Sequence, residues 1–214
     1  MGVAEPSTAR GRETRERVLL AAARLFHERG VNATSVDDVL TAAAAGKGQF
    51  YRYFPSKDEL VAAVVRHQLE DYLARQRETL EQLEDWESLE GYLMGLAAAH
   101  RERGFVGGCP VGSLALELAD QDEGLRRRLA EGFDQWQASL AAGLRRMAER
   151  GRLREGAPAD RLAATTLATV QGAYLLATVR RDGGVMAQAL REAVTHLRAY
   201  ATDPDGDRET DGTV

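Results

Sequence analysis

The sequence predicts an all-α protein in two parts: an N-terminal three-helix domain with a helix-turn-helix, followed by a larger helical domain. Alternating β-branched runs and Asn-Gly hairpin turns, which are typical of strands, are absent, whereas Ala, Leu, Arg and Glu dominate. Apolar residues recur at helical spacing in segments bounded by glycine or proline. With 214 residues, 44% of them hydrophobic, the chain has enough apolar material for a core.

Local stop and start signals divide the first sixty residues into short helices. Gly30 ends the apolar periodicity of the first helix, and Thr34 and Ser35 are candidate N-caps of the second. A turn over 44–46 precedes the third helix, and Ser56 to Glu59 has the pattern of a capping box that opens a long fourth helix. The helices are expected, approximately, over 13–29, 36–43, 47–54, from 57 onwards, 88–103, 111–119, 122–150, 159–181 and 185–201.

The net charge of −5 is distributed unevenly along the chain. Residues 1–60 hold nine basic and eight acidic side chains, whereas residues 61–214 hold nineteen and twenty-five. Between Arg10 and Lys57 the balance is nine basic against five acidic side chains, so a locally basic surface is compatible with an acidic protein. We therefore do not exclude a nucleic-acid partner on the basis of net charge.

The compartment is predicted from the cysteine count and from the N-terminal residues. Cys109 is the sole cysteine, which is typical of a protein in a reducing compartment. Residues 1–17 are rich in charge and lack the apolar core of a signal peptide. We also see no apolar run of the length that a membrane helix needs, and therefore expect a cytoplasmic protein with no membrane partner.

The segment from Lys47 to Leu60, KGQFYRYFPSKDEL, carries the most specific signal in the chain. Three short helices, the last two joined by a tight turn, have the arrangement of a helix-turn-helix, in which the second helix of the motif enters the major groove of DNA. This segment closely resembles the recognition helix of TetR-family transcriptional regulators, and the likeness extends back to Arg17 through Gly30, Thr34, Ser35 and Val39. Many members of that family have Gly at the position of Ala44 and Ser at the position of Gly46.

The residue types on this segment suit DNA. Lys47 and Gln49 are placed to reach base edges, Gln can pair with adenine, and Gly48 allows close approach of the backbone. Hydroxyl and cationic groups nearby suit phosphate oxygens. Together with the resemblance, this chemistry predicts DNA contacts from Thr34, Ser35, Lys47, Gly48, Gln49, Tyr51, Arg52, Tyr53 and Lys57. An arginine-rich arm could add contacts through Arg10, Arg12, Arg15 and Arg17, whereas Phe50 and Phe54 are expected to be core.

The resemblance implies that the remaining helices bind an effector and form a homodimer. We accordingly expect an arm and DNA-binding domain over 1–60, an effector-binding and dimerisation domain over 61–202, and a polar tail over 203–214. The last two long helices would form the dimer interface. The candidates for lining an apolar or aromatic effector site are Tyr92, His100, Cys109, Phe133, Trp136, Gln171 and Tyr174, although ordinary core packing is the favoured role for any single one of them.

An enzyme is disfavoured because His27, His67, His100 and His196 are scattered, no Glu-x-x-His pair exists, and no phosphate-binding loop of GxxxxGK[ST] type is present. No catalytic residue, metal or cofactor is therefore expected. A constitutive DNA-binding protein without an effector remains open. The leading interpretation is a ligand-responsive repressor that binds palindromic operator DNA as a homodimer.

Overall fold

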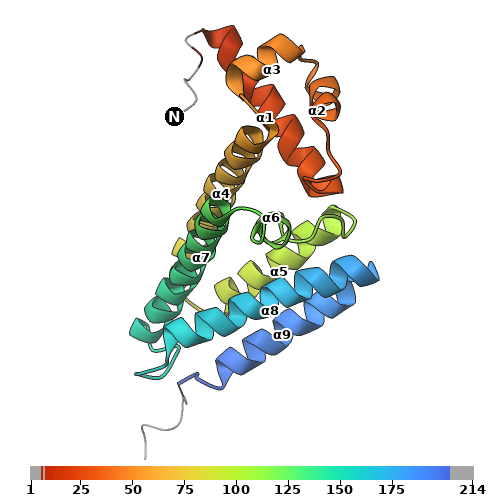
Figure 1. Cartoon of the computed structure of the whole chain (residues 1–214). Helices are drawn as coiled ribbons and strands as arrows, with labels where there is room; N and C mark the ends of the chain where they lie inside the picture. Colours follow the sequence, from red (N-terminus) through yellow and green to blue (C-terminus); the bar gives the residue numbers. More distant parts are fainter. Residues whose placement is uncertain (1–5, 7, 203–214) are drawn as a thin grey trace, which may run out of the picture. The chain divides into compact units, whose positions relative to one another are not determined.

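The computed structural model describes residue 6 and residues 8–202, so the predicted polar tail over 203–214 lies outside the described residues. Within this part the chain forms nine α-helices and no strand, with one isolated bridge between Leu153 and Ala201 (Figure 1). The predicted all-α class is confirmed. The chain folds into two compact units: unit 1 comprises Met1–Tyr72 and Cys109–Gly132, and unit 2 comprises Leu73–Gly108 and Phe133–Val214.

Unit 1 contains the expected short helices and two segments from later in the chain. It consists of α1 (Ala9–Arg29), α2 (Val36–Ala43), α3 (Lys47–Tyr53), the first part of α4 (Lys57–Glu81), α6 (Pro110–Leu118) and the start of α7 (Glu123–Glu149). α1 packs against α2, α3 and α6. Val18, Phe50 and Phe54 are each at most 1% exposed, so apolar burial holds these short helices together. The predicted domain boundary at residue 60 concerns function and stays a prediction.

α1 begins four residues earlier than expected. The hydroxyl of Thr8 accepts a hydrogen bond from the backbone N–H of Gly11 at 3.1 Å, which caps the helix at Thr8 instead of near Glu13. Arg10 and Arg12, which lie before the expected helix start, are therefore helical residues of α1 together with Arg15 and Arg17. Arg15 lies over the ring of Phe54 at 5.3 Å, and Arg17 pairs with Glu13 at 3.8 Å.

The turn between α2 and α3 contains a strained alanine. α2 opens with the predicted cap at Ser35, whose hydroxyl and backbone N–H donate to Asp38 and hold the pKa of that carboxyl below its usual range. It ends at Ala44, which has left-handed angles of φ 47° and ψ 49°. Gly46, in contrast, has extended angles and needs no glycine freedom. The turn thus demands its left-handed residue at position 44 and not at position 46.

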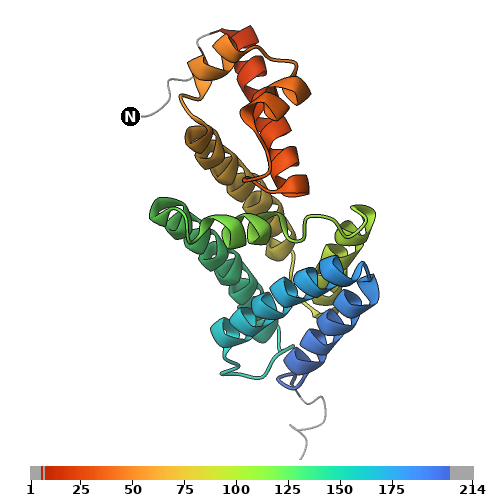
Figure 2. The ribbon, with the colours of Figure 1, turned by 45° about the vertical axis from the view of Figure 1, so that its right-hand side comes forward.

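Unit 2 contains the remaining helices. It consists of the end of α4, α5 (Trp86–Glu102), most of α7, α8 (Ala159–Arg180) and α9 (Gly183–Arg198). α9 packs against both α8 and α5, and α8 and α9 lie side by side in both ribbon views (Figures 1 and 2). The largest fully buried side chains in this unit are Trp136, Leu80, Leu83, Leu89, Leu93, Leu140, Leu144, Met147 and Leu153.

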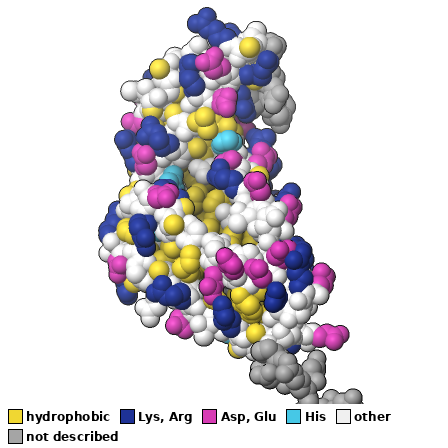
Figure 3. Space-filling model, turned by 180° about the vertical axis from the view of Figure 1, so that it is seen from behind, with side chains coloured by type: hydrophobic (Ala, Val, Ile, Leu, Met, Phe, Trp, Pro, Cys, Tyr) yellow, Lys and Arg dark blue, Asp and Glu magenta, His cyan; other side chains and the backbone are white. Residues whose placement is uncertain are grey.

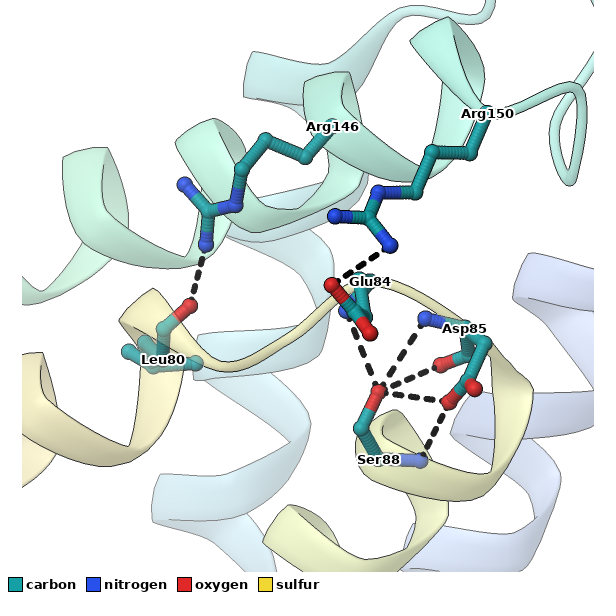
Figure 4. A network of polar contacts seen from close by, with 6 residues as sticks. All are labelled: Leu80, Glu84, Asp85, Ser88, Arg146 and Arg150. Carbon is teal, nitrogen blue, oxygen red and sulfur yellow. Dashed lines mark hydrogen bonds and ion pairs between the residues drawn. The ribbon is translucent and has the colours of Figure 1, made fainter.

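A polar network fixes the turn between α4 and α5 to the end of α7 (Figure 4). Arg146 donates to the carbonyl of Leu80, and Arg150 pairs with Glu84 at 2.5 Å. Ser88 donates its backbone N–H (2.8 Å) and hydroxyl (2.7 Å) to Asp85, which lowers the pKa of that carboxyl and caps α5. The turn is therefore held by charged groups at both of its ends.

α8 does not meet the prediction that no segment is long and apolar enough to cross a membrane. By length and composition it passes as a membrane span, since one 18-residue window has a mean hydropathy of 1.4. Its residues Leu162, Val170 and Tyr174 are nevertheless buried, and it packs against α9. An apolar helix of this kind is typical of the core of a soluble protein.

We predict that Ala44→Gly raises the free energy of unfolding by about 1 kcal/mol, because glycine removes the steric cost of a side chain in the left-handed region. Urea denaturation followed by circular dichroism measures the change. Ala42→Gly, two residues earlier on the exposed side of α2, is the control and should destabilise by about 1 kcal/mol through lost helix propensity. Equal destabilisation by both substitutions would contradict the left-handed conformation at Ala44.

Candidate nucleic-acid interface

α3 separates scaffold residues from exposed polar residues along one short helix. Phe50 and Tyr53 are buried, and Phe50 packs against Phe54 with ring centroids 5.8 Å apart. Since these residues are three and four positions apart, they face the same way and orient the rest of the helix outwards. The residues left exposed are Lys47, Gly48, Gln49, Tyr51 and Arg52, five of the nine predicted DNA contacts.

Two of these exposed side chains already have partners within unit 1. The ammonium of Lys47 lies 3.1 Å from the carboxylate of Asp37 on α2, and both side chains are 69% exposed. Such a solvated pair is weak and is readily exchanged for a phosphate. The side-chain oxygen of Gln49 accepts from the N–H of Gly46 at 3.1 Å, so Gln49 also caps α3. Its amide group retains donors for a base.

The other predicted contacts occupy different environments. Ser35 is exposed at the start of α2, whereas Thr34 is 1% exposed and its hydroxyl donates to the carbonyl of Gly30 at 2.8 Å. Contact of the Thr34 side chain with DNA does not fit this burial, because its hydroxyl closes the preceding loop. Tyr53 is 7% exposed, with its hydroxyl beside Gly11. Any DNA contact of Tyr53 is therefore limited to its hydroxyl. Lys57 is half-buried and donates to the carbonyl of Val31 at 2.8 Å.

Gly48 is the residue of α3 with no internal reason to be glycine. Its φ is not positive, and a Cβ at this position would meet no atom within 4 Å. Glycine within a helix costs stability relative to alanine. The space that it leaves open faces solvent, so the structure offers room for the backbone of α3 to approach an external surface closely.

Charge on the molecule is mixed. On the face shown in Figure 3, basic and acidic side chains are interspersed instead of gathered into one basic region. Lys47 and Arg52 on α3 and Arg10 and Arg12 on α1 are exposed cations of unit 1. Within the described residues no group of three or more His, Cys, Asp or Glu side chains could hold a metal ion. The chemistry of this surface is therefore that of polar and cationic donors, which suits nucleic acid.

Comparison with known proteins is consistent with this geometry over nearly the whole chain. Residues 18–64 match the family model described as bacterial regulatory proteins, tetR family, and residues 86–192 match the C-terminal domain of LmrA/YxaF-like transcriptional regulators. An HTH-type transcriptional regulator in the lacX 3' region of Lactococcus lactis subsp. lactis is 34% identical over 187 residues, which cover 82% of this chain and 88% of that protein. The chain belongs to the TetR family.

Two further relatives of this TetR-family chain agree in fold and length. The crystal structure of a TetR transcriptional regulator from Chloroflexus aurantiacus has a TM-score of 0.80 and 28% identity, covering 91% of this chain and 98% of that one. The HTH-type transcriptional repressor DhaR of a Mycobacterium species is 28% identical over 170 residues, which cover 78% of this chain and 84% of DhaR. The chain is thus a DNA-binding transcriptional regulator and not an enzyme, as the sequence predicted.

Six of the seven predicted effector residues of this TetR-family chain lie in unit 2, and five of these make contacts in two clusters. In the first, the indole N–H of Trp136 donates to the hydroxyl of Tyr92 at 2.6 Å, and that hydroxyl donates to Gln76 at 2.8 Å. Phe133 stacks on Trp136 with centroids 6.4 Å apart. The polar groups of this cluster are satisfied by one another, so the contacts support a core role here at least as well as a ligand role.

The second cluster surrounds His100, which is fully buried. Its Nε2 lies 3.0 Å from the hydroxyl of Thr178, and the ring of Tyr174 lies 5.0 Å from the imidazole. Gln171 is half-buried on α8, three residues before Tyr174. Cys109 is buried, occupies the N-cap position of α6 and belongs to unit 1.

Sequence reasoning missed one residue that reaches the DNA-binding helices. Glu117 on α6 accepts hydrogen bonds from the N–H groups of Val31 and Asn32, at 2.8 and 2.7 Å. More than eighty positions separate these partners in the chain, and a half-buried glutamate in an apolar helix carries no local pattern that would have identified it.

We predict that Gly48→Ala stabilises the protein but weakens DNA binding. Alanine should raise the free energy of unfolding by up to about 1 kcal/mol, because it is the better helix former. The added methyl group should lower affinity for operator DNA, because it occupies the space that close approach requires. Denaturation and fluorescence anisotropy measure the two effects. Unchanged affinity in the stabilised variant would show that DNA does not approach α3 at Gly48.

Proposed function

We propose that this protein is a cytoplasmic, ligand-responsive repressor that binds a palindromic operator as a homodimer and is released by an apolar or aromatic small molecule. The exposed polar face of α3 carries the DNA-binding half of the proposal. Lys47 and Gln49 on its first turn would face base edges, with Tyr51 and Arg52 beside them for phosphates. A repressor role is consistent with the similarity to DhaR.

An exposed apolar stripe on α8 supports the homodimer. Leu175, Leu176 and Val179 are 53%, 43% and 73% exposed, which is unusual for large apolar side chains on one helix face. Gly172, one turn earlier, is also exposed, and a Cβ there would meet nothing within 4 Å. Small and apolar residues together allow close helix packing between two copies of α8. A symmetric dimer would present two copies of α3, which is what a two-fold operator requires.

The effector half of the proposal is supported by the size and composition of unit 2. Its aromatic residues Tyr92, Phe133 and Trp136 lie together, and His100 lies against Tyr174. Sites for small molecules are mostly apolar with a few orienting polar groups, and these clusters have that composition. A ligand that enters between their aromatic rings would exchange internal hydrogen bonds for its own.

A constitutive DNA-binding regulator is the second candidate. It is favoured by the mutual hydrogen bonds of Trp136, Tyr92 and Gln76, which leave this cluster complete without a ligand. The two candidates differ in one measurable property. A ligand that binds the native state raises its stability, whereas a constitutive regulator shows no such response to any compound.

Val179→Glu should disrupt the dimer, because a charge would be buried within the apolar stripe. We expect a monomer by analytical ultracentrifugation. Selection from random duplexes should then yield inverted repeats with the native chain and no inverted repeat with the variant. Leu20→Glu, at an exposed leucine of α1, is the control and should remain dimeric. A dimeric Val179→Glu protein would exclude this face as the interface.

An effector found by thermal stabilisation should weaken operator binding by about 5- to 150-fold, the usual range of allosteric coupling. Linkage requires that operator DNA weaken effector binding by the same factor. Calorimetric titration of the free protein and of its operator complex measures both sides. Identical ligand affinities in the two titrations would favour the constitutive alternative.

A further inference from the structure

The carboxylate of Glu117 is bound by the backbone of the loop that joins α1 to α2. Its Oε2 accepts from the N–H of Val31 at 2.8 Å and its Oε1 from the N–H of Asn32 at 2.7 Å. Gly30, the C-cap of α1, has a φ of 86°, which turns the two following N–H groups into an anion-binding nest. A Cβ on Gly30 would lie 3.2 Å from the carboxylate, so this glycine also makes room for it.

The same loop residue is held from its other side by Lys57. The ammonium of Lys57 donates to the carbonyl of Val31 at 2.8 Å. Val31 therefore donates one charge-assisted hydrogen bond through its N–H, to Glu117, and accepts another at its C=O, from Lys57. Such bonds are stronger than neutral ones. The bond to Val31 uses one of the three N–H donors of the ammonium. The others remain suited to a phosphate oxygen.

The loop is anchored by the buried side chain of Val31 but has open space beside its backbone. A groove of about 430 Å³ opens beside it, lined by Val31 and Asn32 of the loop and by Lys57, Leu118 and Gln121 among others. Thr34 donates to the carbonyl of Gly30 at 2.8 Å, so the loop behaves as one hydrogen-bonded piece. If the carboxylate of Glu117 is removed, the loop can shift into the groove, and the acceptor of Lys57 moves with it.

We propose that Glu117 is a positioning residue for DNA binding. Its carboxylate holds the backbone of Val31 in place, and the carbonyl of Val31 holds the ammonium of Lys57. Lys57 then binds a phosphate in the operator complex. The inference rests on the proposed phosphate contact of Lys57. Glu117 can fill this role without touching DNA.

A double-mutant cycle tests the coupling in the full-length protein. Glu117→Gln, Lys57→Ala and the double variant are titrated with an operator duplex obtained by selection, over a range of salt concentrations. Lys57→Ala should reduce the magnitude of the slope of log K against log salt by about 0.9 per protomer and weaken DNA binding on the order of tenfold. Glu117→Gln should also reduce the magnitude of the salt slope and weaken DNA binding. The double variant should bind no more weakly than Lys57→Ala.

A structural role for Glu117 predicts a different pattern. Glu117→Gln would then lower the free energy of unfolding, while affinity and salt slope in the folded protein stayed native, or its effect would add to that of Lys57→Ala. Either result overturns the proposal. Native salt dependence in Lys57→Ala would overturn the phosphate contact itself and, with it, this inference. Native dependence in Glu117→Gln alone would leave the phosphate contact intact.

Two further measurements separate charge from position. Glu70→Gln removes the same charge at an exposed site of α4 and should leave affinity native. Amide hydrogen exchange at Val31 and Asn32 should accelerate in Glu117→Gln, because both N–H groups lose their charged acceptor. If Glu117→Gln does not fold, Glu117→Asp is measured instead. Its shorter side chain keeps the charge but cannot reach both N–H groups, and the same loss of affinity and slope is expected.

Discussion

The burial of Phe50 and Phe54 beside α1 is the contact on which the DNA-binding surface depends. α3 has only seven residues, and an isolated helix needs about 12 to 15 to be even marginally stable. Phe50 is fully buried, Phe54 is 1% exposed, and the guanidinium of Arg15 covers the Phe54 ring. Because the two phenylalanines lie four residues apart, their burial sets the orientation of all the remaining side chains of α3. Stability of the helix and presentation of its polar face are thus a single constraint.

Most helix boundaries were predictable because they are set locally. Gly30, Ser35 and Ser56 act through backbone conformation or hydrogen bonds within three or four residues, and the structure places helix ends at each of them. The start of α1 was missed for a physical reason. Its first turns bury Gly11 and Thr14, small residues that lack the apolar periodicity by which a helix is recognised in sequence.

The candidate site divides in the same way. The exposed face of α3 follows from spacing within one helix, so the sequence was sufficient to predict it. Thr34 and Ser35 look alike as candidate caps, but one residue fills the cap position and the other is buried, which needs the folded loop to decide. The contact between Glu117 and Val31 joins segments 86 residues apart, as the bond between Trp136 and Tyr92 joins segments 44 apart. Pairings of that kind arise from tertiary packing and leave no mark in local sequence.

The left-handed alanine at position 44 bears on how this regulator could change its operator. Natural proteins lie just above a stability threshold, and most substitutions are destabilising. Each new recognition residue therefore uses part of a small excess in the free energy of unfolding. A chain that keeps alanine where the backbone favours glycine leaves a stabilising substitution unused, at a position outside the recognition helix α3. Evolution or a protein engineer could make that substitution first and then vary the exposed residues of α3. The tight turn thus influences how many operator sequences are accessible to the recognition helix that follows it.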